Sequence, residues 1–524
     1  MKTYKPNNLP FLQAQILERI YVNIARAKQT TLKELSLLTD YPVQSKILSD
    51  AINSLFKKGF ITNSPGGPFS FSVPEERIEF FKEVIKRNDY KHKHYSRWIL
   101  NSFNNNMAQL TLFFKKQTVS ELNQYGIIHK WYNYLEEFPY SLIEKKINEY
   151  RLNSDALVVD PFCGSGTTLV SANLFNLDAI GFDTNPLMAF ISKVKTTWDI
   201  NLVEFKKTII NVAETFLNRV KDIDKIKFKN DFMSVMPKKE INQWLSPILQ
   251  KEVSLLKDII NEVKNEKIKN LLLLAMSKSC FDASHVSLCP GTTFYPFREK
   301  EEFWDLFSKK TVQMYNDLKL LQEHNNYGKS KIINDTCLNA QKYVDKDSID
   351  FIITSPPYPN DLEYTRQTRL ELYLLDFVRG MEDIQQIKRK MTKGSTKLIF
   401  KESNSERCIH NFQDVIEVSN KIYQQTKDKK WGFDYPRMVR EYFGDMYLCL
   451  KEIYPLLRDG SHFLLVVGDQ TVKGILIPVG DILINMAKSI GYNNCRKELF
   501  RMRRSTGHNI PLPEEIVILE KGKT

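Results

Sequence analysis

The sequence predicts an α/β protein with a Rossmann-like doubly wound sheet, an N-terminal winged-helix-like domain and a mostly helical insert. Two observations predict this architecture. Short apolar runs alternate with tight turns and helical patterns over residues 156–182, and this alternation resumes from residue 331. Between them, residues 191–328 show apolar residues at helical spacing, which predicts that a helical insert divides the sheet-forming sequence.

Composition narrows the possible classes of protein. A chain of 524 residues with 42% hydrophobic content is long enough for two to four packed domains and is too apolar for a disordered polymer. It contains no run of about 18 apolar residues, which disfavours a membrane protein. Residues 1–7 lead into no apolar run, so we expect no secretory signal and a cytoplasmic location.

Charge and cysteine content point to a partner and a redox state. Lys and Arg number 75 against 62 Asp and Glu, a formal charge of +13, which raises the odds of a polyanionic partner such as nucleic acid. The seven cysteines show neither paired CxxC spacing nor flanking histidines. We therefore expect reduced, mostly buried thiols and no metal site.

Residues 1–85 are predicted to form the winged-helix-like domain, and residues 86–124 a connector. Three helical segments precede two apolar runs that flank a proline- and glycine-rich turn: Leu12–Ile24, a helix opening at Thr31, Ser45–Phe56, and the hairpin formed by Phe60–Thr62 and Phe69–Val73. This pattern resembles a winged helix. It is compatible with DNA contact and equally with a structural or dimerising role.

The first half of the sheet is expected in residues 125–190. Ala156–Val159 reads as a strand, Asp160–Gly166 as a tight turn, Thr167–Asn176 as a helix and Ala179–Phe182 as the next strand. Gly164 and Gly166 would let the backbone approach a ligand closely, since a Cβ at either position would fill that space.

Neither common phosphate-binding motif fits this turn. No Lys follows it as a P-loop requires, and Leu169 stands where a dinucleotide-binding loop would need its third glycine. Asp183 ends the next strand, where doubly wound folds place a carboxylate on ribose hydroxyls. A plain β-turn with a solvated Asp is the alternative.

Residues 191–328 form the predicted helical insert, with Val253–Leu273 as a representative helix. Residues 329–524 complete the sheet and carry a basic, polar insert at 380–435. The expected elements of this second half are the strands Lys331–Ile333, Ile349–Ile353 and Phe463–Val467, a helix at Asp481–Ile490 and a hairpin from Cys495 to Leu519.

The most specific signal is Thr354–Tyr358, where a buried strand ends in a hydroxyl, two prolines and an aromatic ring. Prolines fix φ and remove N–H donors, which makes a rigid ledge rich in acceptors. The Ser355 hydroxyl and the Pro356 carbonyl are candidates to accept the two hydrogens of an exocyclic amine on cytosine or adenine. That pairing would favour the pyramidal nitrogen that attacks a methyl group, while Tyr358 would stack on a flipped base.

Together, Asp160–Thr168 and Thr354–Tyr358 resemble the paired motifs of S-adenosylmethionine-dependent DNA amino-methyltransferases. The Ser-Pro-Pro-Tyr form is typical of the cytosine-N4 subgroup. The resemblance implies a catalytic ledge of Ser355, Pro356, Pro357 and Tyr358. It implies that S-adenosylmethionine contacts Phe138, Asp160, Phe162, Gly164, Gly166, Thr167, Thr168, Asp183 and Asp335.

Two departures from the family pattern bear on the target base. The cofactor motif precedes the catalytic motif, and about 150 mostly helical residues separate Asp183 from Asp335. An Asp in place of Ser355 would favour adenine, whereas Ser favours cytosine. The mechanism accepts either amine. Methylation of RNA, protein-associated methylation and a non-catalytic DNA-binding regulator that keeps the fold are the alternatives.

Double-stranded DNA and a cognate restriction endonuclease are the partners that the resemblance implies. Three segments compete to recognise the target sequence: the N-terminal domain, residues 191–328 and residues 380–435. We favour residues 191–328 because of their place between the two halves of the sheet. Phosphate contacts are expected from Arg366, Arg369, Arg501, Arg503 and Arg504, and surface salt bridges are the ordinary alternative.

Overall fold

The computed structural model divides the chain into two compact units, residues 1–107 and 108–524. In the first unit it describes residues 30–31, 52–53, 62–63 and 70–72. In the second it describes residues 119–523 except for 125, 135–136, 288–292, 295–301, 325, 429–431, 433 and 505–509.

Three short strands are described in the first unit. They are β1 (Thr30–Thr31), β2 (Thr62–Asn63) and β3 (Ser70–Ser72), in the order β1-β3-β2 with antiparallel pairing. Thr62 pairs with Ser72, which confirms the predicted hairpin. Most of the three predicted helices and residues 86–118 lie outside the described residues, so the winged helix stays a prediction.

A seven-stranded sheet forms the centre of the second unit, in the order β13-β14-β10-β9-β4-β5-β8. Neighbours from β10 to β8 run parallel, and β14 is antiparallel to both β10 and β13. This arrangement confirms the predicted mixed α/β fold with a mostly parallel sheet. The strands are β4 (Leu157–Asp160), β5 (Asp178–Phe182), β8 (Ser330–Ile333), β9 (Ile349–Thr354), β10 (Leu457–Gly468), β13 (Tyr492–Arg504) and β14 (Pro511–Lys521).

The strand order reverses between β4 and β9. After β4 the chain adds β5 and β8 on one side, then returns to place β9 and β10 on the other. In open α/β sheets, ligands bind outside the carboxyl ends of the strands at such a reversal. The fold therefore directs attention to the residues after Asp160 and after Thr354.

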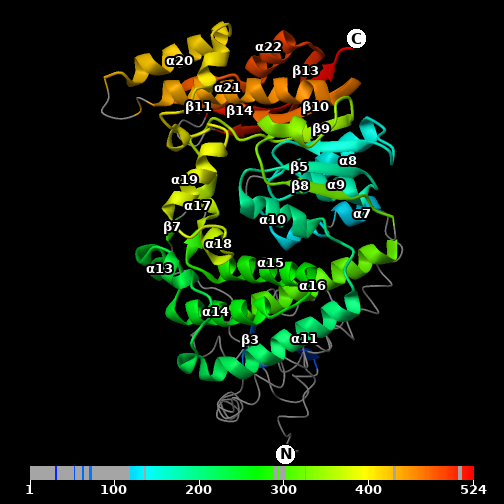
Figure 1. The fold of residues 1–524 in the computed structure, drawn as a ribbon, viewed down its shortest axis with the longest axis vertical. Helices are drawn as coiled ribbons and strands as arrows, with labels where there is room; N and C mark the ends of the chain where they lie inside the picture. The colour runs from blue at the N-terminus through cyan, green and yellow to red at the C-terminus, as the bar shows by residue number, and fades with distance from the viewer. Residues whose placement is uncertain are drawn as a thin grey trace, which may run out of the picture. The chain divides into compact units, whose positions relative to one another are not determined.

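Both faces of the central strands β4 and β9 are buried, which explains why these two strands are almost continuously apolar. Val158, Phe351 and Leu464 pack on one side with two helices, α8 (Tyr140–Glu149) and α9 (Thr167–Leu174). Val159 and Phe463 pack on the other side with three helices, α20 (Gln413–Thr426), α21 (Tyr435–Ile453) and α22 (Val479–Ile490). Side chains alternate between the two faces along each strand, so each strand needs apolar residues at consecutive positions. Figure 1 shows the sheet between these helices.

The remaining elements surround this core. The helices are α7 (Val119–Gln124), α8 (Tyr140–Glu149), α9 (Thr167–Leu174), α10 (Pro186–Lys195), α11 (Leu202–Arg219), α12 (Phe232–Val235), α13 (Lys238–Trp244), α14 (Pro247–Asn261), α15 (Glu266–Ala283), α16 (Phe303–His324), α17 (Tyr364–Gln367), α18 (Arg369–Leu374), α19 (Met381–Lys390), α20 (Gln413–Thr426), α21 (Tyr435–Ile453) and α22 (Val479–Ile490). Short 3₁₀ helices are η2 (His129–Trp131), η3 (Val220–Lys225), η4 (Cys337–Lys342), η5 (Thr396–Leu398), η6 (Ser405–Ile409) and η7 (Tyr454–Leu456). Two small hairpins pair β6 (Val286–Ser287) with β7 (Thr293–Phe294) and β11 (Gln470–Val472) with β12 (Ile475–Ile477).

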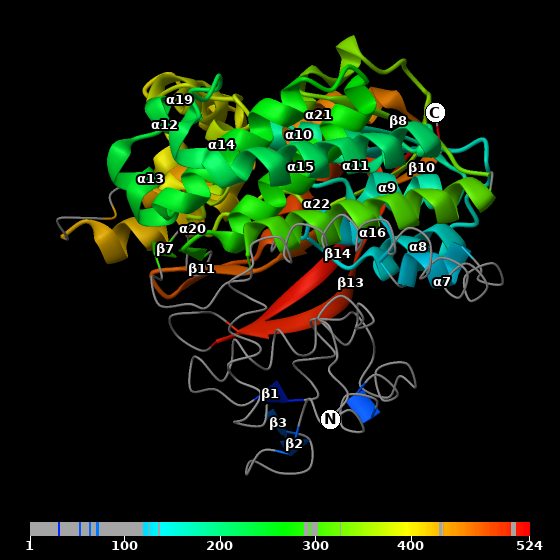
Figure 2. The ribbon, with the colours of Figure 1, turned by 90° about the horizontal axis from the view of Figure 1, so that it is seen from below.

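The predicted insert at 191–328 is helical where it is described, apart from the β6–β7 hairpin. Helices α11, α14, α15 and α16 lie side by side in it, in green in Figures 1 and 2. The predicted single helix Val253–Leu273 is wrong, because α14 ends at Asn261 and α15 begins at Glu266. The Asn265 side chain accepts the N–H groups of Lys267 and Ile268, so it caps a new helix where the apolar spacing seemed continuous.

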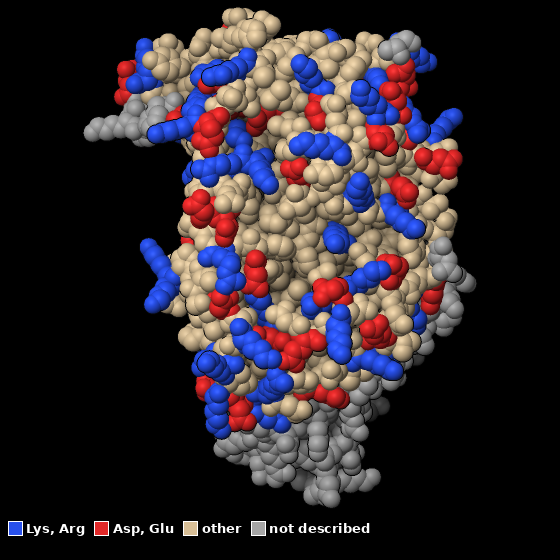
Figure 3. All heavy atoms as spheres, viewed as in Figure 1, with Lys and Arg blue, Asp and Glu red and all other residues tan. Residues whose placement is uncertain are grey.

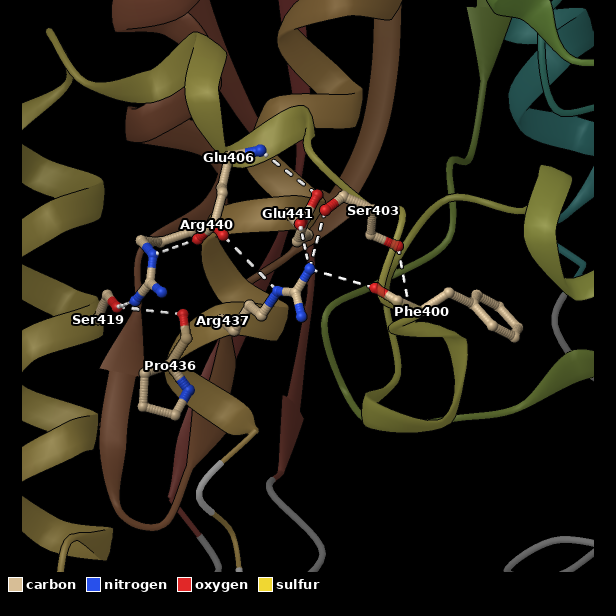
Figure 4. A network of polar contacts seen from close by, with 8 residues as sticks. All are labelled: Phe400, Ser403, Glu406, Ser419, Pro436, Arg437, Arg440 and Glu441. Carbon is tan, nitrogen blue, oxygen red and sulfur yellow. Dashed lines mark hydrogen bonds and ion pairs between the residues drawn. The ribbon is translucent and has the colours of Figure 1, made fainter.

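Helix α21 anchors the insert at 380–435. Arg440 bonds Glu406 at 2.8 Å and the Ser419 hydroxyl at 2.7 Å, while Arg437 donates to the carbonyl of Ser403 at 2.8 Å (Figure 4). The helix also has no side chain at Gly444, where a Cβ would lie 2.2 Å from the carbonyl oxygen of Ser405. The insert is thus packed tightly against the body of the unit.

The surface viewed in Figure 3 carries charges of both signs. Lys and Arg side chains are interspersed with Asp and Glu over the described residues, and the positive excess does not gather into one patch on this face. Within the described ranges, no helix is both long and apolar enough to cross a membrane.

We predict that Gly444→Ala lowers the stability of the protein by disturbing the packing of the insert at 380–435 against α21. The added Cβ would overlap the Ser405 carbonyl, and overpacking of this kind costs about 1–3 kcal/mol. Denaturant unfolding should show this loss in the midpoint. Gly380→Ala is the matched control, because its φ is −169° and an added Cβ meets nothing within 4 Å. Equal stability of the two variants would contradict the packing argument.

Candidate active site

The two predicted motifs meet at the strand reversal. The Thr354 hydroxyl, at the end of β9, donates to a carboxylate oxygen of Asp160, at the end of β4, over 2.5 Å. The same oxygen accepts the Phe162 N–H at 3.0 Å. Burial raises the pKa of Asp160 to about 6, although these hydrogen bonds oppose the rise. Residues 194 positions apart in the sequence are thereby held in direct contact.

A cavity of about 220 Å³ opens beside this junction. Its walls come from both halves of the sheet and from the insert at 380–435. The predicted site residues that line it are Phe138, Phe162, Gly164, Thr167, Asp183, Asp335, Ser355, Pro356, Pro357, Tyr358, Arg501 and Arg503. One continuous space therefore contacts the glycine turn and the proline ledge.

The two glycines of the turn have different surroundings. Gly164 has φ +49° and faces open space, because a Cβ there would meet nothing within 4 Å. Gly166 has φ +89°, and its Cβ would lie 2.9 Å from the Ser192 hydroxyl of α10. Gly166 therefore serves helix packing, which corrects the expectation that both glycines make room for a ligand. Cys163 is buried and lies against Gly181 of β5, as expected for a packing residue.

Two carboxylates lie on the same side of the cavity as the turn. Asp183 accepts the N–H of Gly164 at 3.0 Å and that of Asn185 at 2.8 Å. Burial raises the pKa of Asp183 to about 7 despite these bonds. The pKa of Asp335 is shifted in the opposite direction. Partial burial acts to raise its pKa, but hydrogen bonds from Thr336, Tyr343 and Asn339 outweigh that effect and lower it.

A partly buried ion pair lies next to the turn. The Ser165 hydroxyl bonds the carboxylate of Glu137, which lies 4.0 Å from the ammonium of Lys195. Lys195 is fully buried, and burial lowers its pKa, while burial raises the pKa of Glu137. Glu137 lines the cavity next to Phe138, so this segment forms one wall, as the sequence predicts for Phe138.

The ledge is held at several points. The Tyr358 hydroxyl lies 3.5 Å from the Ser355 hydroxyl, 3.3 Å from the Val466 carbonyl oxygen and 3.0 Å from the Glu514 carboxylate. A Cβ at Gly394 would lie 2.5 Å from the Tyr358 carbonyl oxygen, so the insert packs directly on the ledge. The Arg503 guanidinium lies over the Tyr358 ring, 5.3 Å from its centre, and so covers one face of the ring that is expected to stack on a base.

Several predicted residues do not line the cavity. Asp160 and Gly166 are not among its lining residues. The Thr168 hydroxyl donates to the Ile353 carbonyl oxygen of β9 and is not a lining residue either. Arg366 and Arg504 are exposed and are not among its lining residues. Arg369 is mostly buried and pairs with Glu240 at 3.0 Å, so its position does not support the predicted phosphate contact.

Other lining residues were missed by the sequence analysis. Glu137, Lys390 and Glu514 are charged residues on three walls of the cavity. Glu137 directly precedes the predicted Phe138, and Lys390 belongs to the basic run 388–390, so weak signals existed for both. Glu514 lies in an ordinary strand pattern and carries no sequence signal. In the described part of residues 191–328, no residue lines the cavity.

Comparisons with known proteins agree with this geometry. A family model described as DNA methylase matches residues 54–193, which include the glycine turn and Asp183. Curated relatives include the type II methyltransferase M.AvaI of Nostoc sp., 26% identical over 396 residues, covering 70% of this chain and 79% of the relative.

Two further relatives are type II methyltransferases of similar likeness. M.BsoBI of Geobacillus stearothermophilus is 23% identical over 461 residues, covering 79% of this chain and 90% of the relative. M.MvaI of Kocuria varians is 27% identical over 354 residues, covering 62% of this chain and 72% of the relative. A solved S-adenosylmethionine-dependent methyltransferase, SibL in its apo form, matches with 6% identity and a TM-score of 0.21 over 98% of this chain and 96% of that chain.

We predict that Asp183→Asn changes how the stability of the protein depends on pH. The folded-state pKa of about 7 exceeds the ordinary 3.8, so the protonated form stabilises the fold. Its contribution is complete below about pH 4 and is lost as the pH rises through about 7. The variant lacks this loss and should gain roughly 1–4 kcal/mol relative to wild type between pH 4 and 7.

Denaturant unfolding at several pH values measures this difference. Asp335→Asn is the control with the opposite sign, because the pKa of Asp335 is lowered and its charged form stabilises the fold. A constant difference between Asp183→Asn and wild type across this range would refute the prediction.

In sequence, this chain is thus similar to a DNA methylase family and to type II methyltransferases.

Proposed function

We propose that this protein transfers a methyl group from S-adenosylmethionine to the exocyclic amine of a base flipped out of DNA, with cytosine N4 as the acceptor. The observation that carries the proposal is the single cavity that contacts both the glycine turn and the Ser355–Tyr358 ledge. A donor and an acceptor must lie next to each other for direct transfer, and this cavity has a wall suited to each.

The turn side of the cavity fits the cofactor. Gly164 leaves open space at the backbone, and two aromatic side chains, Phe138 and Phe162, offer apolar contact for an adenine ring. The carboxylates of Asp183 and Asp335 are acceptors for ribose hydroxyls and for the adenine amino group. When bound, S-adenosylmethionine supplies a methyl group activated by a sulfonium centre.

The ledge side fits an amine. The Ser355 hydroxyl oxygen and the Pro356 carbonyl are acceptors at the wall of the cavity, and neither proline of the ledge can donate an N–H that would repel the amine hydrogens. Two acceptors on the two amine hydrogens favour a pyramidal nitrogen whose lone pair is localised and not delocalised into the ring. As the N–C bond forms, the bond between the methyl group and the sulfur of the donor would break and S-adenosylhomocysteine would leave, while the amine loses one proton to water.

The serine favours cytosine N4 as the acceptor, and adenine N6 is the second candidate. Nucleosides from DNA incubated with the protein and labelled donor, separated by mass, distinguish N4-methylcytosine from N6-methyladenine. Label in RNA would favour the RNA alternative. No transfer to any nucleic acid would overturn the proposal in favour of a binding protein with this fold.

We predict that Ser355→Ala lowers the rate of methyl transfer by roughly 100-fold or more, because it removes one of the two acceptors for the amine. Affinity for S-adenosylhomocysteine should stay close to wild type, since Ser355 belongs to the ledge wall and the cofactor is expected on the turn side. Single-turnover assays and calorimetry measure the two effects. Undiminished transfer would remove Ser355 from the mechanism.

A further inference from the structure

Glu514 is a buried carboxylate at the wall of the cavity, on the strand β14 that neither motif includes. It is 4% exposed and pairs in register with Gly468 of β10 and Arg501 of β13. A buried carboxylate is costly unless its oxygens are paired. The partners of its two carboxylate oxygens therefore indicate the role of this side chain.

The two oxygens of Glu514 have different partners. One accepts the Tyr358 hydroxyl at 3.0 Å and lies 3.7 Å from Nε of Arg503. The other bonds Nε of Arg501. Two guanidinium groups lie beside the carboxylate, and a carboxylate oxygen with these donors around it accepts hydrogen bonds.

This property fixes the direction of a hydrogen-bond chain. A tyrosine hydroxyl has one hydrogen, and the carboxylate oxygen of Glu514 at 3.0 Å is a closer acceptor than the Val466 carbonyl oxygen at 3.3 Å. With that hydrogen directed to Glu514, the oxygen of Tyr358 presents lone pairs to its surroundings. The Ser355 hydroxyl, 3.5 Å away, then donates its own hydrogen to Tyr358.

The direction of these hydrogen bonds determines whether the Ser355 hydroxyl donates to a substrate or accepts from it. A hydroxyl whose hydrogen points to Tyr358 turns its lone pairs toward the cavity, where an amine hydrogen needs an acceptor. We propose that Glu514 is a positioning residue that sets Ser355 as an acceptor by ordering the chain Ser355 to Tyr358 to Glu514. This inference rests on the proposed function.

Glu514 could instead serve the two arginines by holding them toward DNA phosphates. The two roles differ in the step that they affect. If Glu514 orders the hydrogen bonds from Ser355 to Tyr358, removing it lowers the rate of methyl transfer in the bound complex. If Glu514 instead holds Arg501 and Arg503, removing it weakens DNA binding and leaves the rate at saturating DNA unchanged.

The test compares three variants with wild type in single-turnover assays at saturating DNA and donor. Glu514→Met removes the acceptor and should slow transfer roughly 10- to 100-fold. Tyr358→Phe keeps the ring, breaks the chain and should have a similar effect. The double variant should be no slower than the slower single variant, because both changes break the same chain.

Glu514→Gln gives a rescue test. The amide oxygen can still accept from Tyr358, but the amide nitrogen can also donate, so this variant should fall between wild type and Glu514→Met. Glu515→Gln is the matched control, since Glu515 is next on the same strand, pairs with Lys497 at 3.2 Å and does not line the cavity. Its rate should equal that of wild type.

Thermal unfolding and S-adenosylhomocysteine binding show whether each variant is folded. Wild-type transfer by a folded Glu514→Met would overturn the inference and leave the proposed function intact. Multiplying effects in the double variant would overturn it too, as would a change confined to DNA affinity. Absence of transfer by the wild-type protein would overturn the proposed function and this inference with it.

Discussion

The hydrogen bond between Thr354 and Asp160 is the contact on which the site depends. It joins the carboxyl ends of β4 and β9 at the reversal of strand order, and the glycine turn and the proline ledge both begin there. Asp160 is 1% exposed, and a buried carboxylate without donors would be strongly unfavourable. The need to satisfy this one group therefore couples the geometry of the cofactor side to that of the substrate side.

The ledge is fixed by residues from three distant parts of the chain. Asp361, at φ +63° just beyond it, accepts hydrogen bonds from Ser395, Thr396 and Tyr435. The insert at 380–435 and α21 are thus connected to the ledge through one carboxylate. Since a side chain that orients a small amine must be positioned within about 0.5 Å, such redundant anchoring suits a site that acts by orientation.

The sequence predicted what local patterns encode. The carboxyl ends of the parallel strands were predicted to within one residue, because alternation, glycine and proline act over a few residues. The start of β10 was not, since this strand begins at Leu457 and not at the predicted Phe463. Glu514 was not predicted, because its role depends on Tyr358, 156 residues away, across two strand pairings. Gly166 was misassigned for the same reason. The sequence shows that a side chain is absent there, but the neighbour it makes room for, Ser192, is known only from the packed structure.

The two inserts, residues 191–328 and 380–435, differ in whether they reach the cavity. Their order along the chain favoured residues 191–328 as the segment that recognises the target, yet the segment that reaches the cavity is 390–392. Arg369, joined to Glu240 of the helical insert, is mostly buried, whereas Arg501 is 52% exposed at the cavity wall. Under the proposed function, the 380–435 insert and the β13–β14 hairpin are the segments beside the cavity that would receive a flipped base, and recognition of the target sequence by residues 191–328 stays a prediction. Topology sets which segment lies there, and sequence order between the motifs does not.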